Sequence, residues 1–298
     1  MGSSFGWSLG HPHLTNFSLG LKQEPLPDFA ALRANLLQLV NEERAVAKVP
    51  AVALDDLATR VATAHALDMA SGEFVSHWGR DGLKPYQRYS FAGGVHATQE
   101  NVSAADNTWS MKTKDLLQDT SYLHVRLYSE QPPNDGHRQA ILAPQHTHVG
   151  FGIAIEKLRL RMVELFVSKY VQLNTVAQMA KPGDTVDFAG KLLKPNNALS
   201  QIEVCYEPLP NAPALDWLRT PRSYSLPDES IILVPKLPPP YLYADKRAGS
   251  IELSPGGSFS VPIRLFKDAP GIYTVVCWVK RTRSESAFPA TEFCIRAE

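Results

Sequence analysis

The stretch His148-Val-Gly-Phe-Gly-Ile-Ala-Ile155 marks a change in the pattern of this sequence. Small or polar residues alternate in it with apolar residues, and this period of two predicts a strand with one buried face. A second strand is predicted over residues 161–171, after a turn at 156–159. Apolar residues upstream recur instead at helical spacing, so helices precede an antiparallel strand pair. This order is typical of an α+β domain or a layered α/β/α domain.

The helices expected upstream are defined by apolar stripes and by their boundaries. In the first of them, Asp28 is a plausible N-cap. The predicted helices cover residues 28–47, 55–71, 115–130 and 137–142. Residues 77–101 are rich in Gly and are expected to form a loop. The first 27 residues show no periodicity and are expected to be an irregular arm, in which His11 and His13 are more readily solvated than bound to a metal.

Downstream of Lys181-Pro-Gly-Asp184 the sequence consists of short β-rich segments separated by Pro, Gly, Asn and Asp. Seven strands are predicted, over residues 185–193, 202–206, 231–234, 250–253, 258–265, 273–280 and 291–296. Their number and spacing are typical of a β-sandwich of immunoglobulin-like size. The predicted domains are therefore the arm at 1–27, an α/β domain at 28–178 and an all-β sandwich at 182–298.

Composition excludes several classes of protein. Lys and Arg number 30, as do Asp and Glu, so the net charge is zero and offers no overall attraction to nucleic acid or to an anionic membrane. No apolar run is long enough for a transmembrane helix, and the N-terminus shows no signal peptide. The three Cys include no CxxC motif, which excludes a zinc ribbon. Cys277 and Cys294 lie on predicted neighbouring strands. They are expected either to form a disulfide in an oxidising compartment or to remain buried free thiols.

Four polar residues lie at or beside the ends of predicted elements in the first domain: His77, Glu100, Glu130 and His137. Two imidazoles offer nitrogen donors for a divalent transition metal, and two carboxylates can orient the rings through their other nitrogen. Zinc or copper suits such a group better than calcium, which prefers oxygen ligands. Nine His and 30 acidic residues also produce such a quartet by chance, so spacing alone identifies it weakly.

The remaining His residues in this region are expected to have other roles. His65 is expected on a helix face. His124 is expected at a surface position of its helix, with a position facing the cleft as the alternative. His146 and His148 are expected in a polar loop, with a second metal site there as the alternative.

The order of several local motifs resembles the CAP superfamily (cysteine-rich secretory proteins, antigen 5 and pathogenesis-related class 1 proteins, also called SCP-like proteins), in its bacterial form. The resemblance covers roughly residues 28–175. The segments that carry it are Leu39-Val-Asn-Glu-Glu-Arg44, Leu54-Asp-Asp-Leu57, His77, Gln99-Glu-Asn-Val102, Tyr128-Ser-Glu-Gln-Pro132, Gly136-His-Arg-Gln-Ala-Ile-Leu142 and Val149-Gly-Phe-Gly152.

This resemblance implies a three-layer α/β/α sandwich with a large central cleft. It also implies that His77 and His137 bind zinc or another divalent metal. Glu100 and Glu130 would then contact the two His residues and not the metal itself. The chain departs from the eukaryotic members: Glu130 and His137 are only seven residues apart, and the domain has no Cys. The resemblance implies a secreted or cell-surface protein.

The leading functional hypothesis is a binding module whose cleft holds a divalent metal or a small ligand, with the β-sandwich for adhesion or partner contacts. A small molecule or lipid, or a protein or cell-surface partner, is expected, and no nucleic acid. The alternative is a metal-dependent hydrolase, a peptidase or esterase, with Glu100 as candidate base. Two protein ligands are fewer than the three usual in catalytic zinc sites, so binding is favoured over catalysis. A third possibility is that the four residues only cross-link loops by hydrogen bonds.

Overall fold

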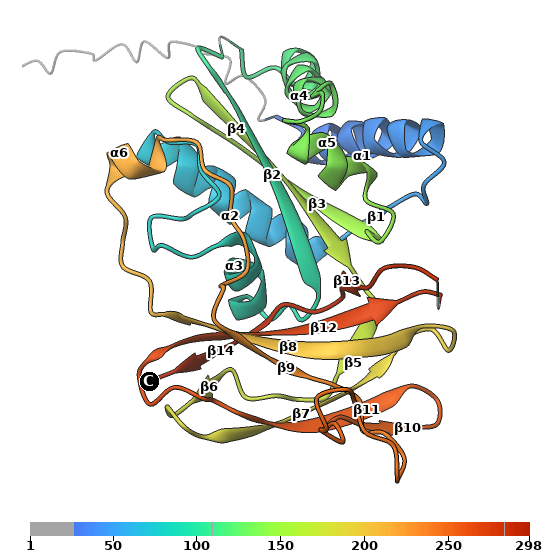
Figure 1. The fold of residues 1–298 in the computed structure, drawn as a ribbon. Helices are drawn as coiled ribbons and strands as arrows, with labels where there is room; N and C mark the ends of the chain where they lie inside the picture. The colour runs from blue at the N-terminus through green and yellow to red at the C-terminus, as the bar shows by residue number, and fades with distance from the viewer. Residues whose placement is uncertain (1–26, 109, 283) are drawn as a thin grey trace, which may run out of the picture.

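A computed structural model describes residues 27–298 of the chain with the exception of residues 109 and 283. Its first half combines helices with one sheet, and its second half is almost entirely β (Figure 1). The elements of the first half are α1 (Phe29–Val46), β1 (Ala53–Leu54), α2 (Asp56–Gly72), α3 (Pro85–Phe91), β2 (Ala97–Asp106), α4 (Thr113–Tyr128), α5 (Gly136–Leu142), β3 (His148–Glu156) and β4 (Arg159–Ser168). The predicted arm, with His11 and His13, lies outside the described residues apart from Pro27.

The first half is a three-layer sandwich. Its four-stranded sheet has the order β1-β3-β4-β2, in which β3 and β2 are both antiparallel to β4. Helices α1, α4 and α5 share one apolar core with one face of the sheet. Helix α2 and part of α3 share a second core with the other face (Figure 1). The α+β class and the layered arrangement predicted from sequence are thus confirmed.

The predicted helices form where apolar spacing and caps coincide. The Asp28 carboxylate accepts hydrogen bonds from the backbone N–H groups of Ala30 and Ala31, both at 3.0 Å, which satisfies free donors of the first turn of α1. The Asp55 carboxylate caps α2 by accepting from Ala58 N–H at 2.6 Å. In α1, buried residues recur at Leu32, Leu36 and Val40. The helical stripe and the cap therefore position each helix on the sheet.

The prediction of a loop over residues 77–101 is wrong in part, because this segment contains α3 and the beginning of β2. Strand β2 begins Ala97-Thr-Gln-Glu-Asn101, a polar sequence that does not show the apolar alternation of a half-buried strand. It is nevertheless paired along its length with β4. Its polar residues are used to line a cleft, and for this reason hydrophobic periodicity does not reveal the strand.

The second half contains two sheets. Their elements are β5 (Val171–Leu173), β6 (Met179–Ala180), β7 (Thr185–Leu192), β8 (Ala198–Pro208), α6 (Leu215–Leu218), β9 (Ser230–Leu233), β10 (Glu252–Ser254), β11 (Ser258–Arg264), β12 (Gly271–Lys280), β13 (Phe288–Pro289) and β14 (Phe293–Ala297). One sheet has the order β10-β11-β7-β5, and the other has the order β6-β14-β12-β8-β9 with β13 beside β12. Each of the seven predicted strands overlaps one of these strands. Strand β5, which the predicted boundary assigns to the first domain, pairs with β7.

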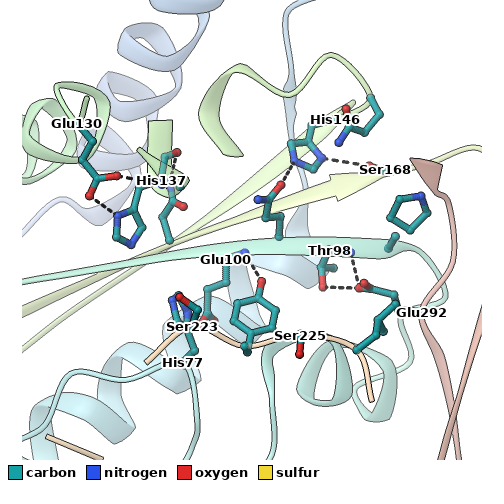
Figure 2. A pocket seen from close by; sticks show the side chains of 18 of the residues that line it. His77, Thr98, Glu100, Glu130, His137, His146, Ser168, Ser223, Ser225 and Glu292 are labelled. Atoms are coloured by element: carbon teal, nitrogen blue, oxygen red, sulfur yellow. Dashed lines mark hydrogen bonds and ion pairs between the residues drawn. The ribbon is translucent and has the colours of Figure 1, made fainter. Parts of the chain in front are cut away.

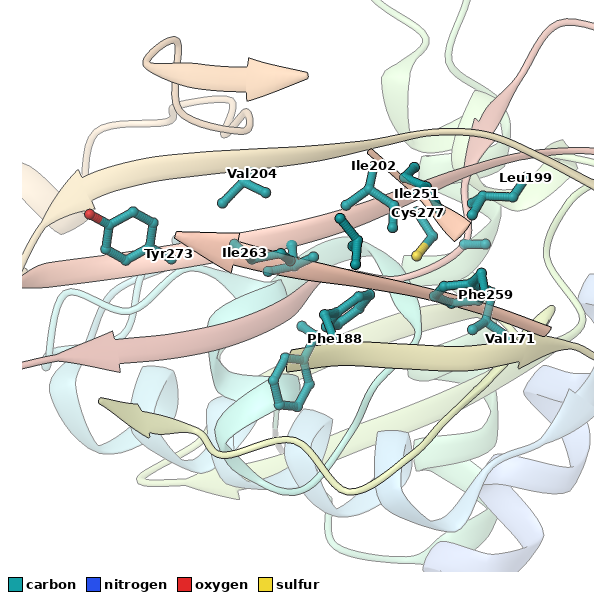
Figure 3. Packing of buried hydrophobic residues seen from close by; sticks show 14 of the residues in the cluster. Val171, Phe188, Leu199, Ile202, Val204, Ile251, Phe259, Ile263, Tyr273 and Cys277 are labelled. Carbon is teal, nitrogen blue, oxygen red and sulfur yellow. The ribbon is translucent and has the colours of Figure 1, made fainter. Parts of the chain in front are cut away.

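Apolar side chains from both sheets of the second half form one core (Figure 3). Phe188 of β7 packs against Phe259 of the same sheet, with ring centroids 6.1 Å apart, and against Phe293 of the other sheet at 6.2 Å. All three cysteines are buried free thiols, as one of the two alternatives predicted. Cys277 contributes to this core, whereas Cys294 belongs to a cluster with Tyr86 of α3. The two thiols therefore lie in different clusters.

The two halves meet along α3. The carboxylate of Glu207, at the end of β8, accepts hydrogen bonds from the Tyr86 hydroxyl at 3.1 Å and from the Gln87 amide at 2.9 Å. Residues 209–229, here named the connecting segment, join β8 to β9. In this segment Trp217 packs edge-on against Trp78 with centroids 5.2 Å apart, so the segment is anchored on the first half (Figure 1).

Candidate functional site

A cavity of about 670 Å³ opens beside strand β2, and all four predicted residues line it or its rim. His77 follows α2, Glu100 lies in β2, Glu130 follows α4, and His137 begins α5 (Figure 2). The loop between α5 and β3, the connecting segment and the approach to β14 contribute further parts of the wall. The structure therefore brings the four residues to one cleft, to which both halves of the chain contribute. We refer to this cavity as the cleft.

Glu100 orients the His77 ring at one side of the cleft. Its Oε1 lies 3.0 Å from His77 Nδ1, and its Oε2 accepts a hydrogen bond from Arg88 at 2.7 Å. Burial by itself raises the pKa of Glu100, but Arg88, with His65 and His77, lowers this pKa to about 2. The ionised carboxylate can only accept, so the proton of a neutral His77 ring resides on Nδ1 and the Nε2 lone pair is free.

The connecting segment also supports this side of the cleft. The Glu100 backbone N–H donates to the Tyr224 hydroxyl at 2.9 Å. The Tyr224 and His77 rings are in contact, with centroids 4.8 Å apart. A residue far downstream in the sequence thereby contacts both members of the His77–Glu100 pair.

Glu130 holds His137 by two contacts. One carboxylate oxygen lies 2.5 Å from His137 Nδ1, and the other accepts from the His137 backbone N–H at 3.1 Å. The seven-residue separation is accommodated because Glu130 and His137 lie on either side of the turn between α4 and α5. Both side chains are partly exposed, which leaves His137 Nε2 available to the cleft.

The two imidazoles face the same cavity with ring centroids 6.4 Å apart. If Nε2 of both rings bound one zinc ion at about 2.1 Å, the ion would lie about 3.2 Å from each centroid, so rings up to about 6.4 Å apart can share it. A tetrahedral angle needs a separation smaller by about 1 Å. No group of three or more His, Cys, Asp or Glu with metal-binding geometry occurs in the described part of the chain. The described residues thus offer two imidazole donors at one cavity, and the remaining ligands of a metal ion would have to come from water or a bound molecule.

A buried charged network centred on His124 of α4 was not predicted from the sequence. His124 is fully buried, and its two ring nitrogens contact Glu164 at 2.6 Å and Glu43 at 2.9 Å. The Asn101 amide donates to Glu164 and to the His137 backbone carbonyl, each at 3.1 Å. The prediction of a surface position for His124 is therefore wrong. His124 lies eight residues after Leu116 and four after Thr120, which is the spacing of a shared helix face and a signal that could have indicated a buried position.

The other predicted His residues have structural environments. His65 is buried on α2, and its Nε2 lies 2.8 Å from the Ser76 backbone carbonyl oxygen. His146 lies in the loop between α5 and β3, as predicted, but it is buried there: its Nδ1 lies 3.1 Å from the Ser168 hydroxyl, and its Nε2 lies 3.2 Å from the Gln99 amide oxygen. His148, expected in the same loop, is the first residue of β3. Burial lowers the pKa of His146 to about 3, so the ring is neutral at the far end of the cleft.

Glu292, which immediately precedes β14, occupies the end of the cleft opposite Glu130 and His137 (Figure 2). Its Oε2 accepts from the Thr98 backbone N–H at 2.8 Å and from the Thr98 hydroxyl at 3.3 Å. Burial raises the pKa of Glu292 to about 8. The sequence analysis missed this residue, since it lies in the β-rich half, far from the motifs that indicated the site.

The raised pKa of Glu292 predicts a pH-dependent cost in stability. Between pH 4.5 and 8 the unfolded chain loses the Glu292 proton while the folded chain retains it, so this residue lowers the free energy of unfolding as pH rises through that window. We expect Glu292→Gln to raise the Tm by about 5 °C at pH 8.5 and to leave it unchanged at pH 4. Thermal unfolding followed by circular dichroism tests this, with the exposed Glu298→Gln as control. Equal Tm values for Glu292→Gln and the parent at pH 8.5 would contradict it.

Comparison with known proteins points to one family for the first half. Residues 37–170 match the model of CAP, the cysteine-rich secretory protein family. This range includes all four predicted cleft residues, whereas Tyr224 and Glu292 lie outside it. A search of curated proteins found no match. No helix in the described part of the chain has the length and apolar character needed to cross a membrane.

Several solved structures are similar to part of the chain. An extracellular protein containing an SCP domain from Bacillus anthracis is 20% identical, with a TM-score of 0.36, over 49% of this chain and 45% of that one. An outer surface protein of Borrelia burgdorferi is 17% identical, with a TM-score of 0.36, over 45% of this chain and 89% of that one. The CAP domain of enterococcal PrgA is 14% identical, with a TM-score of 0.35, over 47% of this chain and 61% of that one. The chain thus spans less than half of the Bacillus protein.

Proposed function

We propose that the CAP domain at residues 37–170 is a binding module that holds a divalent transition metal between His77 and His137 and presents it to a small ligand in the cleft. The observation that carries this proposal is the pairing of each Nδ1 with a carboxylate, which leaves the two Nε2 atoms as donors at one cavity. Imidazole nitrogen suits zinc well. A bound metal would supply a Lewis acid that attracts an electron-rich group of the ligand.

Binding is a better interpretation of this geometry than hydrolysis. A general base works best when its pKa lies near the operating pH, whereas Arg88 and the neighbouring His residues hold the pKa of Glu100 near 2. Glu130 is already engaged by His137 through both carboxylate oxygens. Both carboxylates are therefore better suited to orienting the rings than to taking a proton from water.

The role of the second half is also a proposal. We propose that its two sheets act as a β-sandwich that supports the cleft and offers a surface to a partner. Support for the first role comes from Tyr224 and Glu292, which line the cleft. Support for the second comes from Tyr241 and Leu242, which are 68% and 55% exposed between β9 and β10. We also propose a secreted or cell-surface location, which the resemblance to the CAP family supports.

Zinc titration calorimetry tests the metal proposal. The full chain carrying His11→Ala and His13→Ala is the parent, because those two arm residues offer a competing site. We expect one zinc ion per chain, a loss of affinity of at least about tenfold for His77→Ala or His137→Ala, and no binding when both are replaced, since each ring supplies one of only two protein ligands. His148→Ala, which changes a His outside the cleft, is expected to bind zinc as the parent does.

Two outcomes would overturn this function. One is an unchanged zinc isotherm in the double variant, which would exclude the cleft as the metal site. The other is a lower Tm for each single variant with no change in zinc affinity, which is the result expected if the four residues only cross-link loops.

A further inference from the structure

The cleft contains two buried carboxyl groups with opposite electrostatic surroundings. Glu100 is 4% exposed and is paired with Arg88 at 2.7 Å and with His77 at 3.0 Å. Glu292 is 7% exposed, and no Lys, Arg or His of the described residues lies within ion-pair distance of it. A buried carboxylate without a cationic partner is costly. Glu100 is thus compensated within the protein, and Glu292 is not.

The two oxygens of Glu292 differ in their contacts. Oε2 accepts both hydrogen bonds from Thr98, which fixes the orientation of the carboxyl group at the wall of the cleft. Oε1 makes no hydrogen bond to any residue that the structure describes, and the side chain lines the cavity (Figure 2). One oxygen is held in place, and the other remains for a group inside the cleft.

The rest of the lining also favours a cation. Among the described residues that line the cleft there is no Lys or Arg, and besides Glu292 two are Glu, each already in contact with a His of the cleft. The nearby ring of Tyr224 adds an aromatic surface, which is favourable to ammonium groups. The remaining polar side chains, such as Gln99, Gln145 and Ser225, are neutral and can bind hydroxyl or amide groups.

We propose that Glu292 is the anchor for a protonated primary amine, so that the cleft binds ligands bearing an ammonium group at the end remote from His77 and His137. This deepens the proposed function by naming the ligand class of the same cleft. The ammonium forms a charge-assisted hydrogen bond to Oε1 while Thr98 continues to hold Oε2. The anchor comes from the second half of the chain, so the CAP domain and the β-rich region form the ligand site together.

This arrangement makes amine binding depend on pH. Burial holds the pKa of Glu292 at about 8, while an alkylamine remains protonated to about pH 10.4. Binding requires the ionised carboxylate, so affinity falls by about tenfold for each pH unit below 8. The titratable groups facing Glu292 are Tyr86, Tyr224, Cys205 and Cys294, and burial raises the pKa of each, which keeps them neutral over this range. In the same cleft Glu100 remains ionised and His146 remains neutral.

Ligand-observed NMR titrations on the full chain test the proposal. The probes are 1,5-diaminopentane with 1,5-pentanediol as its neutral counterpart, and glucosamine with glucose, which distinguishes an alkylamine from an amino sugar as the source of the ammonium. We expect at least one amine to bind at least tenfold more tightly than its neutral counterpart at pH 7.5. Glu292→Gln keeps an acceptor for Thr98 but removes the charge, and it is expected to abolish the preference. Glu298→Gln, near the end of β14, is expected to retain it.

The outcomes separate this proposal from the metal site. Equal binding of amine and neutral probes, or an unchanged amine preference in Glu292→Gln, overturns the proposal. The titration is repeated in EDTA and in the His77→Ala, His137→Ala variant. Amine preference that survives there while zinc binding is lost supports two separate anchors. Failure of the parent to bind zinc overturns the metal proposal. The amine proposal is then decided by the NMR titrations alone.

Discussion

Replacing His124 by alanine is expected to lower the free energy of unfolding by about 3–5 kcal/mol. The imidazole is fully buried between Glu43 and Glu164, and each of its nitrogens contacts one carboxylate. Burial alone lowers the pKa of His124, but the two carboxylates outweigh burial and raise it to about 10. The ring is therefore a buried cation at neutral pH. Alanine would leave two carboxylates without their shared partner, and such losses are among the most destabilising single changes.

The same pKa gives the sign of the pH dependence. Because the folded pKa is above the unfolded value of 6.5, the stabilisation from His124 is fully present below pH 6.5 and is lost as pH rises through 10. Urea unfolding at pH 6.5 and pH 10 measures this for the parent and the variant, and the difference between them is expected to shrink at the higher pH. Tyr122→Ala, at a 62% exposed position of the same helix, is the control. If His124→Ala lowers the free energy of unfolding no more than Tyr122→Ala does, the network contributes little to stability.

Gly152→Ala is expected to lower the free energy of unfolding by about 3 kcal/mol or more. A Cβ at this position would lie 2.1 Å from the backbone carbonyl carbon and oxygen of Ala62, in α2. These are backbone atoms of a packed helix, so α2 must move away from β3 to relieve the contact. Gly150, two residues earlier, meets the backbone of α2 at 2.2 Å in the same way. Close packing makes such a displacement costly along the whole helix.

Gly136→Ala is the matched control, because a Cβ there has no neighbour within 4 Å. It is expected to be neutral or slightly stabilising, since alanine reduces the entropy of the unfolded chain. Urea unfolding of both variants, followed by circular dichroism, is the measurement. Similar midpoints for Gly152→Ala and the parent would mean that α2 can separate from the sheet at little cost.

Much of the fold can be predicted from local sequence patterns. The stripe of Leu32, Leu36 and Val40 follows helical spacing, and Asp28 begins its helix as predicted. The seven strands of the second half lie between turn residues that interrupt the chain at short intervals. These features are predictable because the period of burial and the chemistry of turns act over a few residues. Strand β2 escaped prediction because its polar residues line a cleft instead of packing in a core.

The candidate site was predicted in part. His77, Glu100, Glu130 and His137 were selected by their local motifs, and the structure brings all four to one cavity. Which carboxylate holds which ring was not predictable, because these contacts depend on how the ends of α2, α4 and α5 meet β2.

By itself the sequence determined most of the helices and strands, the order of the two halves and the identity of four polar residues of the cleft. The tertiary structure alone decided that His124 is a buried cation and that Glu292 reaches the cleft. The physical reason is distance along the chain. Glu292 meets Thr98 across 194 residues, and His124 meets Glu43 across 81. No local periodicity encodes which distant charges share a cavity, and the balance between burial and pairing arises only when the chain has folded.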